Sequence, residues 1–143
     1  MMLRTHLAFS LFISIFLIQH FNNFFILTFI LATTIPDIDN RHSKIGRYNP
    51  FTSLTKHRGI THSFLFALIL AIILAFATKT FYYPYALFFG YSSHIMLDSL
   101  TKHGTKPFYP FSNIKIKGPI TTNSLTENFL ATILFSLFMI KIL

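Results

Sequence analysis

The sequence predicts an all-α integral membrane protein, a helical bundle of about five helices with two cytoplasmic loops. Hydrophobic residues make up 52% of the chain and charged residues only 11%, whereas soluble domains carry about a quarter charged residues. Nineteen phenylalanines in 143 residues exceed what a small globule can bury. The apolar segments have helical lengths and lack the two-residue period of strands. The length favours a single domain over residues 1–143.

The apolar segments predict the helices in order, at residues 7–18, 24–35, 64–77, 81–97 and 129–140. The first two are expected to form a hairpin, and Ile35 is expected to end the second because it precedes a proline. Ser124 and Glu127 predict a capping box before the last helix. Several segments are shorter than the roughly 20 residues of a membrane span, so flanking Thr and Ser residues must extend them or some helices do not cross.

The basic residues predict the orientation. Ten fall on one side of this five-helix arrangement, namely Arg4, Arg41, Lys44, Arg47, Lys56, Arg58, Lys102, Lys106, Lys115 and Lys117. Lys79 and Lys141 fall on the other side. The positive-inside rule therefore places the N-terminus and the loops at residues 37–61 and 101–123 in the cytoplasm, in a multi-pass protein of the inner membrane. A secretory signal peptide is the alternative for the first segment, but no A-x-A-like cleavage site follows it.

Charge and cysteine content narrow the function classes. The net charge of +8 favours anionic membrane lipid as the partner over nucleic acid, because the cations do not form a basic helix with interleaved aromatic residues. The sequence leaves the oligomeric state open. No cysteine is present, so disulfides, thiolate metal ligands and cysteine nucleophiles are excluded. A metal would need His, Asp, Glu or backbone ligands.

The scarce acidic residues gather at the predicted cytoplasmic helix ends, together with most histidines. The acidic residues are Asp37, Asp39, Asp98 and Glu127, and the histidines at this level are His6, His57, His62 and His94, with His103 in reserve. His94 and Asp98 are four residues apart, so a helix places them on one face about 6 Å apart. This is the spacing of two-residue helical metal motifs. A hydrogen-bonded pair that only joins helices is the alternative.

Two loop motifs extend this set. Asp37 and Asp39 form a D-x-D, and in an extended stretch after a helix alternate carboxylates can share one cation or bridge two. In "HRGITHS", Gly59 allows a sharp turn that would let His57 and His62 face one point. The cations Arg58, Lys56 and Arg47 are the candidates for binding an anionic substrate, since guanidinium suits phosphate. The alternative is a basic loop whose histidines are interfacial anchors.

The ordered motifs "RTH", "PDID", "HRGITHS", "GYSSHIMLD" and "SLTE" resemble the bacterial and archaeal family of membrane-bound, metal-dependent hydrolases, which includes the LexA-binding, inner-membrane-associated hydrolases. The resemblance runs from His6 to Glu127. It implies a metal site formed by His6, Asp37, Asp39, His57, His62, His94 and Asp98. Glu127 matches an acidic residue near the last helix. The chain departs from the pattern after the D-x-D, where Asn40 occupies the usual histidine position and His42 follows.

These observations predict a metal-dependent hydrolase that acts on a phosphoester or another ester at the cytoplasmic membrane surface. Its cofactor would be one or two Zn, Mn or Fe ions, and Asp39 or Glu127 would orient or deprotonate the attacking water. The substrate would be an anionic small molecule or lipid. Two alternatives stand beside this reading. An ion-coupled transporter would need a polar path through the bilayer, and a non-catalytic interaction or structural protein would use the His/Asp cluster to join helices.

Overall fold

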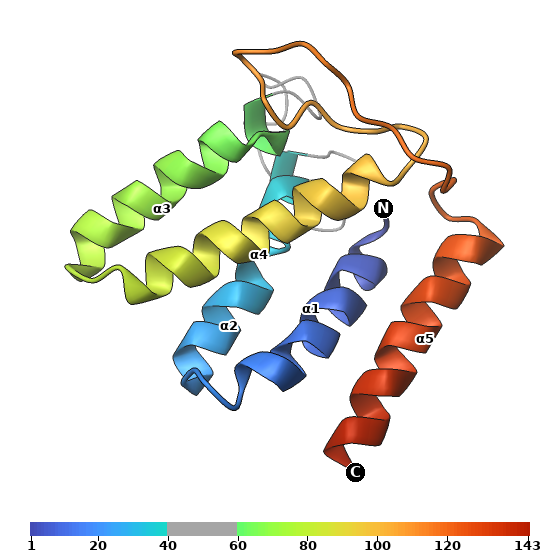
Figure 1. Cartoon of the computed structure of the whole chain (residues 1–143), viewed down its shortest axis with the longest axis horizontal. Coiled ribbons are helices and arrows are strands. Elements are labelled where there is room, and N and C mark those ends of the chain that lie inside the picture. Colours follow the sequence, from blue (N-terminus) through green and yellow to red (C-terminus); the bar gives the residue numbers. More distant parts are fainter. Residues whose placement is uncertain (40–59) are drawn as a thin grey trace.

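The structure is a computed structural model and describes residues 1–39 and 60–143, without the side chains of Ile38 and Asp39. These residues form five α-helices and two short 3-10 helices and no strand, which confirms the all-α fold. The elements are α1 (Leu3–Leu17), α2 (Asn23–Ala32), η1 (Ile35–Asp39), η4 (Ile60–His62), α3 (Phe64–Thr78), α4 (Tyr82–Ser99) and α5 (Leu125–Ile142), shown in Figure 1.

Helix α4 is the central element. It packs against α2 on one side and α3 on the other, while α1 packs mainly against α5 and less against α2. The N-terminus, the end of α4 and the start of α5 lie at one end of the bundle, and the C-terminus lies at the other (Figure 1). The α1–α2 hairpin is confirmed, and Asn22 begins α2 by accepting a hydrogen bond from Phe25 N–H at 2.9 Å.

A glycine brings α2 and α4 into backbone contact. A Cβ atom at Gly90 would lie 2.3 Å from the carbonyl oxygen of Phe29, so no larger residue fits there without movement. Beside this crossing, Phe25, Phe29 and Ala86 form one buried apolar cluster. A second cluster joins α3 to α4 and contains Ala67, Tyr91 and Ile95. The close crossing fixes the end of α2, and therefore η1, relative to α4.

Two helix boundaries differ clearly from the sequence prediction, since α1 begins at Leu3 instead of residue 7 and α2 ends early. Helix α2 ends at Ala32 instead of Ile35, and the D-x-D lies on the 3-10 helix η1 instead of an extended stretch. Pro36 forbids a continued α-helix but tolerates the tighter turn. Helix α3 begins at Phe64, as predicted, with Ser63 as its cap after the short helix η4. Helix α5 begins at Leu125, directly after Ser124 as the capping box predicts and four residues before the apolar segment.

The capping box at α5 is half confirmed. The Ser124 hydroxyl accepts a hydrogen bond from Glu127 N–H at 3.3 Å. The Glu127 carboxylate accepts from the N–H of Asn123 at 2.6 Å, one residue before the capping residue. Asn123 has a φ of 63°, in the left-handed region, which asparagine tolerates better than most residues.

The segment between α4 and α5 folds back on itself. Lys102 N–H donates to the carbonyl of Ile120 at 2.8 Å, and Thr105 and Ile116 exchange two backbone hydrogen bonds of 3.0 and 2.9 Å. Phe64 N–H donates to the carbonyl of Pro107 at 2.8 Å. The segment therefore holds the start of α3 and covers the polar end of the bundle (Figure 1).

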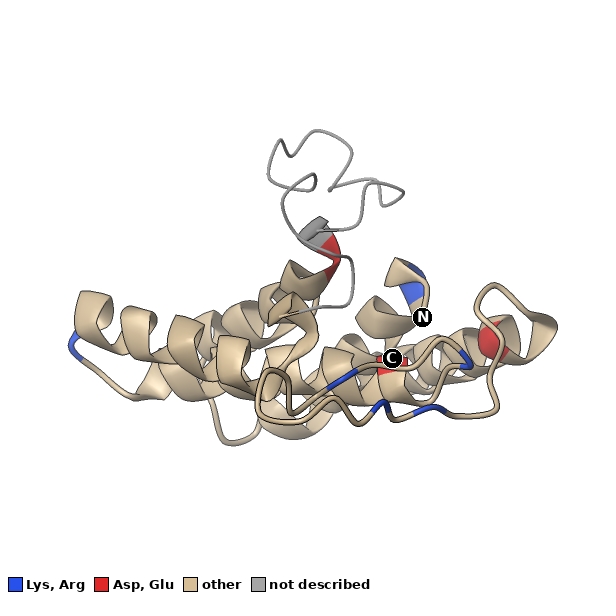
Figure 2. Cartoon of the chain, turned by 90° about the horizontal axis from the view of Figure 1, so that it is seen from above, with Lys and Arg blue, Asp and Glu red and all other residues tan. Residues whose placement is uncertain are grey.

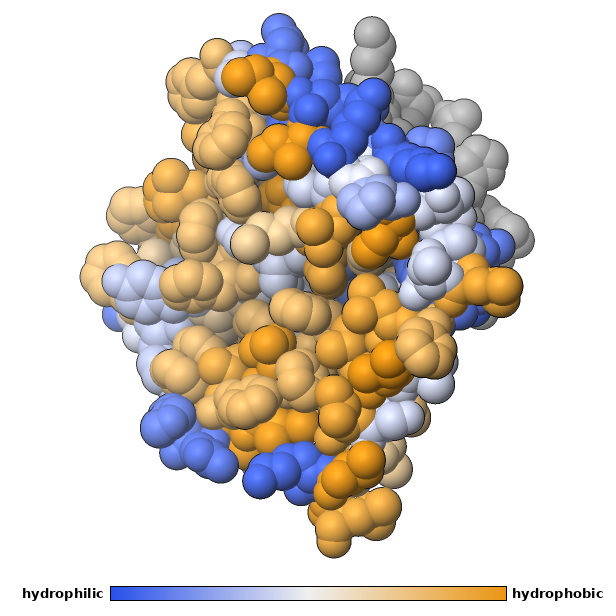
Figure 3. All heavy atoms as spheres, turned by 45° about the vertical axis from the view of Figure 1, so that its right-hand side comes forward, coloured by the Kyte–Doolittle hydropathy of each residue, from blue (hydrophilic) through white to orange (hydrophobic). Residues whose placement is uncertain are grey.

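The membrane character of the helices is uneven. Among the described helices, α5 alone, with 18 residues, is long and apolar enough to cross a membrane, while α1, α2 and α3 are shorter apolar helices. A helix of ten residues is about 15 Å long, half of the roughly 30 Å hydrocarbon core. Apolar residues form a broad belt between two hydrophilic ends (Figure 3), and charged residues lie mainly at helix ends and in the segment before α5 (Figure 2). A multi-pass arrangement remains a prediction.

Candidate metal centre

Five of the predicted ligands converge at the polar end of the bundle. Helix α1 supplies His6, η1 supplies Asp37, η4 supplies His62, and α4 supplies His94 and Asp98. All five are buried. They form two triads that share His94, one with His6 and Asp98 and the other with Asp37 and His62, and one ligand atom per residue lies within 4.8 Å of the others in its triad.

The Asp98 carboxylate lies at the centre of this cluster. Its Oδ1 is 3.4 Å from Nε2 of His6, and its Oδ2 is 3.8 Å from Nε2 of His62 and 3.9 Å from Nε2 of His94. Nε2 of His94 is also 3.8 Å from Oδ1 of Asp37. Two ligands about 2.1 Å from one tetrahedral ion lie about 3.4 Å apart. The measured separations therefore approach those of ligands that share an ion.

The orientation of the His94 ring is set from outside the cluster. Its Nδ1 donates a hydrogen bond to the carbonyl of Thr33 at 2.7 Å, because a carbonyl can only accept. This fixes the proton on Nδ1 and turns the Nε2 lone pair toward Asp37 and Asp98. Metal-binding histidines commonly have such an outer partner. The His6 ring stacks on His94 with a centroid distance of 3.8 Å and an interplanar angle of 8°.

The chemistry of the donor atoms fits a divalent metal. Nδ1 of His6 and Nε2 of His94 are buried and make no hydrogen bond with any described residue. Such atoms are uncommon in folded proteins, because a buried polar group without a partner is costly. Imidazole and carboxylate together suit Zn, Mn or Fe. The α-ammonium of Met1 also hydrogen-bonds Asp98 and brings a positive charge to the cluster.

Two further contacts hold the elements that carry these ligands. The Tyr91 hydroxyl donates to the carbonyl of Thr61 at 2.5 Å and thereby ties η4 to α4. Glu127 is fully buried and holds the start of α1. Its Oε1 accepts from Met2 N–H at 2.6 Å and from the Thr5 hydroxyl at 2.8 Å, and Oε2 accepts from Asn123. A carboxylate also suits the positive end of a helix dipole.

The remaining predicted site residues fall into two groups. His57, Arg58, Lys56, Arg47 and His42 lie outside the described residues, as does the side chain of Asp39 at the end of η1. Glu127 belongs to neither triad, and His103 and His20 are exposed and also outside them. Catalytic roles for Asp39 and Glu127 remain predictions. The role of Thr33 could not be predicted from the sequence, because any residue supplies a backbone carbonyl.

Comparisons with known proteins agree with the membrane assignment. Residues 1–142 match the family described as YdjM inner membrane protein. The chain is 36% identical over 104 residues to the protein named "Uncharacterized protein YvsG" of Bacillus subtilis (strain 168). This match covers 68% of the chain and 64% of that relative, so the chain spans about 64% of the length of the curated protein. No solved structure matches.

Proposed function

From the premise that the chain belongs to the YdjM inner membrane protein family, we propose a multi-pass protein of the cytoplasmic membrane that hydrolyses a phosphoester or another ester at a divalent-metal site facing the cytoplasm. One observation carries the proposal. Three buried imidazoles and two buried carboxylates meet from four separate segments, and the ring of His94 is oriented from behind by the carbonyl of Thr33.

We assign different roles to the residues at this site. His6, His94 and Asp98 would hold one ion, and Asp37 and His62 would complete its shell or hold a second ion through the shared His94. The chemistry that such an ion supplies when bound is Lewis-acid polarisation of the ester and activation of water. Asp39 follows Asp37 by two residues and stays our candidate for orienting or deprotonating the water. Glu127 is better assigned a positioning role, since both of its oxygens accept hydrogen bonds.

Substrate binding is assigned to cations that are close in sequence to His62 and to the D-x-D. Arg58, Lys56 and Arg47 would bind the anionic group of the substrate, and guanidinium matches phosphate in a bidentate way. The same cations support the cytoplasmic orientation through the positive-inside rule. A phosphoester suits both the charge and the location better than a neutral acyl ester.

A non-catalytic protein is the second candidate. Its supporting observation is that Asp98 already accepts a hydrogen bond from the α-ammonium of Met1, so part of the cluster is satisfied without a metal. A transporter has less support. The ligands lie near the start of α1, on η1 and η4, and near the end of α4, whereas coupling-ion sites in transporters lie near mid-membrane on discontinuous helices.

Metal content tests the proposal directly. Elemental mass spectrometry would compare the detergent-purified protein with a His6→Ala, His94→Ala variant and with a His20→Ala, His103→Ala control, which removes two exposed histidines. We expect Zn, Mn or Fe near stoichiometry in the wild type and the control, and its loss in the cluster variant with helical content unchanged by circular dichroism. No metal in any protein after reconstitution with excess ions would favour the helix-joining protein.

Hydrolysis is tested separately on the metal-loaded protein. Phosphoester and acyl-ester substrates would be compared in lipid and soluble forms, with the cluster variant as the blank. We expect turnover of a phosphoester by the wild type and none by the variant. A protein that binds metal but turns over none of these esters would contradict the hydrolase proposal while leaving the metal site in place.

A further inference from the structure

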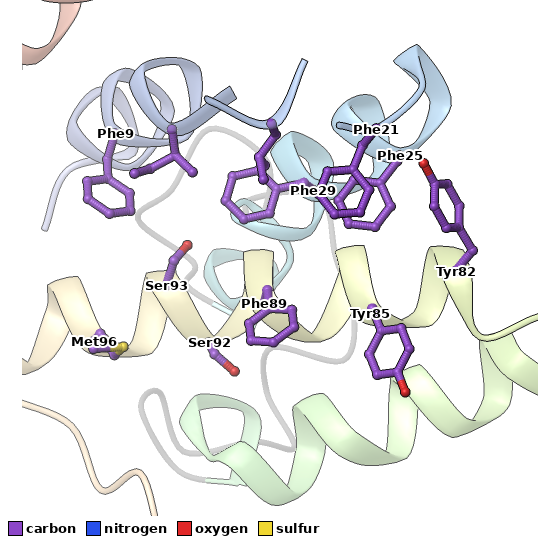
Figure 4. A pocket seen from close by; sticks show the side chains of 12 residues that line it. Phe9, Phe21, Phe25, Phe29, Tyr82, Tyr85, Phe89, Ser92, Ser93 and Met96 are labelled. Carbon is purple, nitrogen blue, oxygen red and sulfur yellow. The ribbon is translucent and has the colours of Figure 1, made fainter. Parts of the chain in front are cut away.

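An apolar groove runs along the bundle between α1 and α4, with α2 as its floor. It has a volume of about 660 Å³. Phe9 and Leu17 line it from α1, Phe29 from α2, and Tyr82, Phe89 and Met96 from α4. Figure 4 shows the aromatic side chains facing this space from both sides. Like this groove, the stacked rings of His6 and His94 lie between α1 and α4. A ligand in the groove could therefore also contact the cluster.

At one end, the residues that line the groove are close in sequence to those of the candidate metal centre. On α1, Phe9 follows His6 by three residues, and on α4, Ser93 directly precedes His94. Residues three apart on a helix lie on neighbouring parts of the same face. The rings of His6 and His94 themselves stack across the gap between these helices. The other end lies at the α1–α2 turn, where Phe21 and Tyr82 line it.

We propose that this groove binds one acyl chain of a membrane phospholipid, with the phosphoester head group at the His/Asp cluster. The inference rests on the proposed function and names its substrate class. From Tyr82 to Met96, α4 rises about 21 Å, which exceeds the roughly 15 Å that the chain of one leaflet covers. The volume of 660 Å³ falls in the range of about 300–1,000 Å³ typical of sites for a single small ligand. One acyl chain fits, and the second acyl chain of the phospholipid would remain in the bilayer.

A polar atom in the groove supports a phospholipid over a plain hydrocarbon. Ser92 lines the groove and is only 8% exposed, and its hydroxyl makes no hydrogen bond with any described residue. By contrast, the hydroxyl of the neighbouring Ser93 donates to the carbonyl of Gly90 at 2.7 Å. Ser92 lies two residues before His94, at the level where the glycerol ester would join chain to head group. An ester carbonyl there would accept its hydrogen bond and relieve the cost of the buried hydroxyl.

Photolabelling in nanodiscs tests the inference. The full chain would be reconstituted with a phosphatidylglycerol carrying a diazirine either at the chain end or near the glycerol, and labelled peptides would be mapped by mass spectrometry. We expect the chain-end probe to label the α1–α2 turn and the start of α4, and the glycerol probe to label α4 near Ser93. Ser93→Phe should reduce both signals about tenfold, because overpacking of this size costs roughly 1.4 kcal/mol.

The control and a second variant keep the outcome decisive. Ser136→Phe makes the same change on the exposed surface of α5 and should leave labelling of the groove unchanged. Met96→Trp narrows the groove at an exposed position and serves if Ser93→Phe does not fold. Even labelling of all helices, insensitive to both groove variants, would overturn the inference and indicate ordinary annular lipid.

Metal content measured on the same samples separates the two proposals. Retained metal with no labelling specific to the groove would overturn the lipid inference alone. Specific labelling without metal would support lipid binding and contradict the hydrolase. Labelling by a probe on a second copy of the chain, in place of the lipid, would assign the groove to self-association and overturn the lipid inference.

Discussion

Helices α4 and α5 have the same length, 18 residues, and opposite surroundings. Half of α4 is buried, including Gly90, His94 and Asp98. Helix α5 buries only Glu127 and Ala131, and 11% of its membrane-length window lies inside the protein. The more apolar helix therefore faces outward, and the helix that carries His94 and Asp98 is buried among its neighbours.

The hydropathy of each helix reflects its surroundings and does not indicate where the candidate site lies. In α5 most side chains are exposed, and an apolar sequence is what a helix exposed to lipid would require. In α4 the polar residues lower the hydropathy, but they face other helices and one another. A hydropathy criterion therefore finds α5 and passes over α4, where the candidate site lies. If α4 is buried among other helices and α5 is exposed to lipid, substitutions on the two helices should have different effects.

The largest effect is expected at the centre of the cluster on α4. Asp98→Asn keeps the shape of the side chain but removes the charge that faces three imidazoles. Changes to outer partners of metal ligands cost about 10–100-fold in affinity, so loss of this ligand should cost at least about 100-fold. Metal titration in detergent would measure it, with the exposed Thr132→Ala on α5 as the control. Unchanged affinity in Asp98→Asn would remove Asp98 from the ligand set.

An effect of comparable free energy is expected on α5. Ile133 lies near the middle of α5 and is 40% exposed. If α5 crosses the bilayer, Ile133→Lys should disfavour insertion by about 2.5–3.5 kcal/mol, whereas a water-facing position would tolerate it within about 0.5 kcal/mol. A membrane-insertion assay would measure the inserted fraction, with Ile133→Leu as the control. Equal insertion of the two variants would show that α5 does not span the membrane.

At the α2–α4 crossing, the sign of the change in unfolding free energy on Gly90→Ala is informative. In an unhindered helix interior, Gly→Ala stabilises by about 0.5–1 kcal/mol. At Gly90 the new methyl group would meet the carbonyl oxygen of Phe29 at 2.3 Å, so we expect Gly90→Ala to destabilise by about 1–3 kcal/mol.

Unfolding of the purified protein in detergent would measure this change. Ser136→Ala on the exposed face of α5 is the control and should stay within about 0.5 kcal/mol. Stabilisation by Gly90→Ala would mean that the two helices lie farther apart than the structure has them.

The same two helices show how far the sequence could predict the structure. The number of helices and the pairing of His94 with Asp98 on one face follow from local periodicity, and both are confirmed. The gathering of His6, Asp37 and His62 around them was expected only because scarce polar residues recurred at helix ends. The exact end of α2 and the 3-10 form of η1 were missed, because they depend on how Pro36 and two threonines follow the helix, which local propensity does not decide.

Tertiary features lay beyond the reach of the sequence. The contact between Gly90 and Phe29 joins residues 61 positions apart, as does the hydrogen bond from His94 to Thr33. The groove needs α1 to stand beside α4 without filling the space between them, and this depends on α1 packing against α5. Glu127 was assigned to catalysis because acidic residues are scarce. Its hydrogen bonds to Met2 and Thr5 depend on that same α1–α5 packing.

The smallest effect tests this role of Glu127, a buried residue of α5 that holds the start of α1. Glu127→Gln keeps the side-chain shape but replaces one acceptor oxygen by an amide donor, so either Asn123 or the pair Met2 and Thr5 loses its partner. The start of α1 should loosen and present His6 less accurately. We expect metal affinity to fall about tenfold, the lower end of the effect of outer partners.

The matched control for Glu127→Gln is Asn128→Ala, which removes the hydrogen bond from Arg4, another α1–α5 contact, and should leave metal affinity unchanged. The two roles of Glu127 predict opposite results. A positioning residue lowers metal affinity, and excess metal should restore turnover in the variant. A general base leaves metal affinity intact while turnover is lost at every metal concentration. The second result would return Glu127 to catalysis and make α5 part of the reacting site.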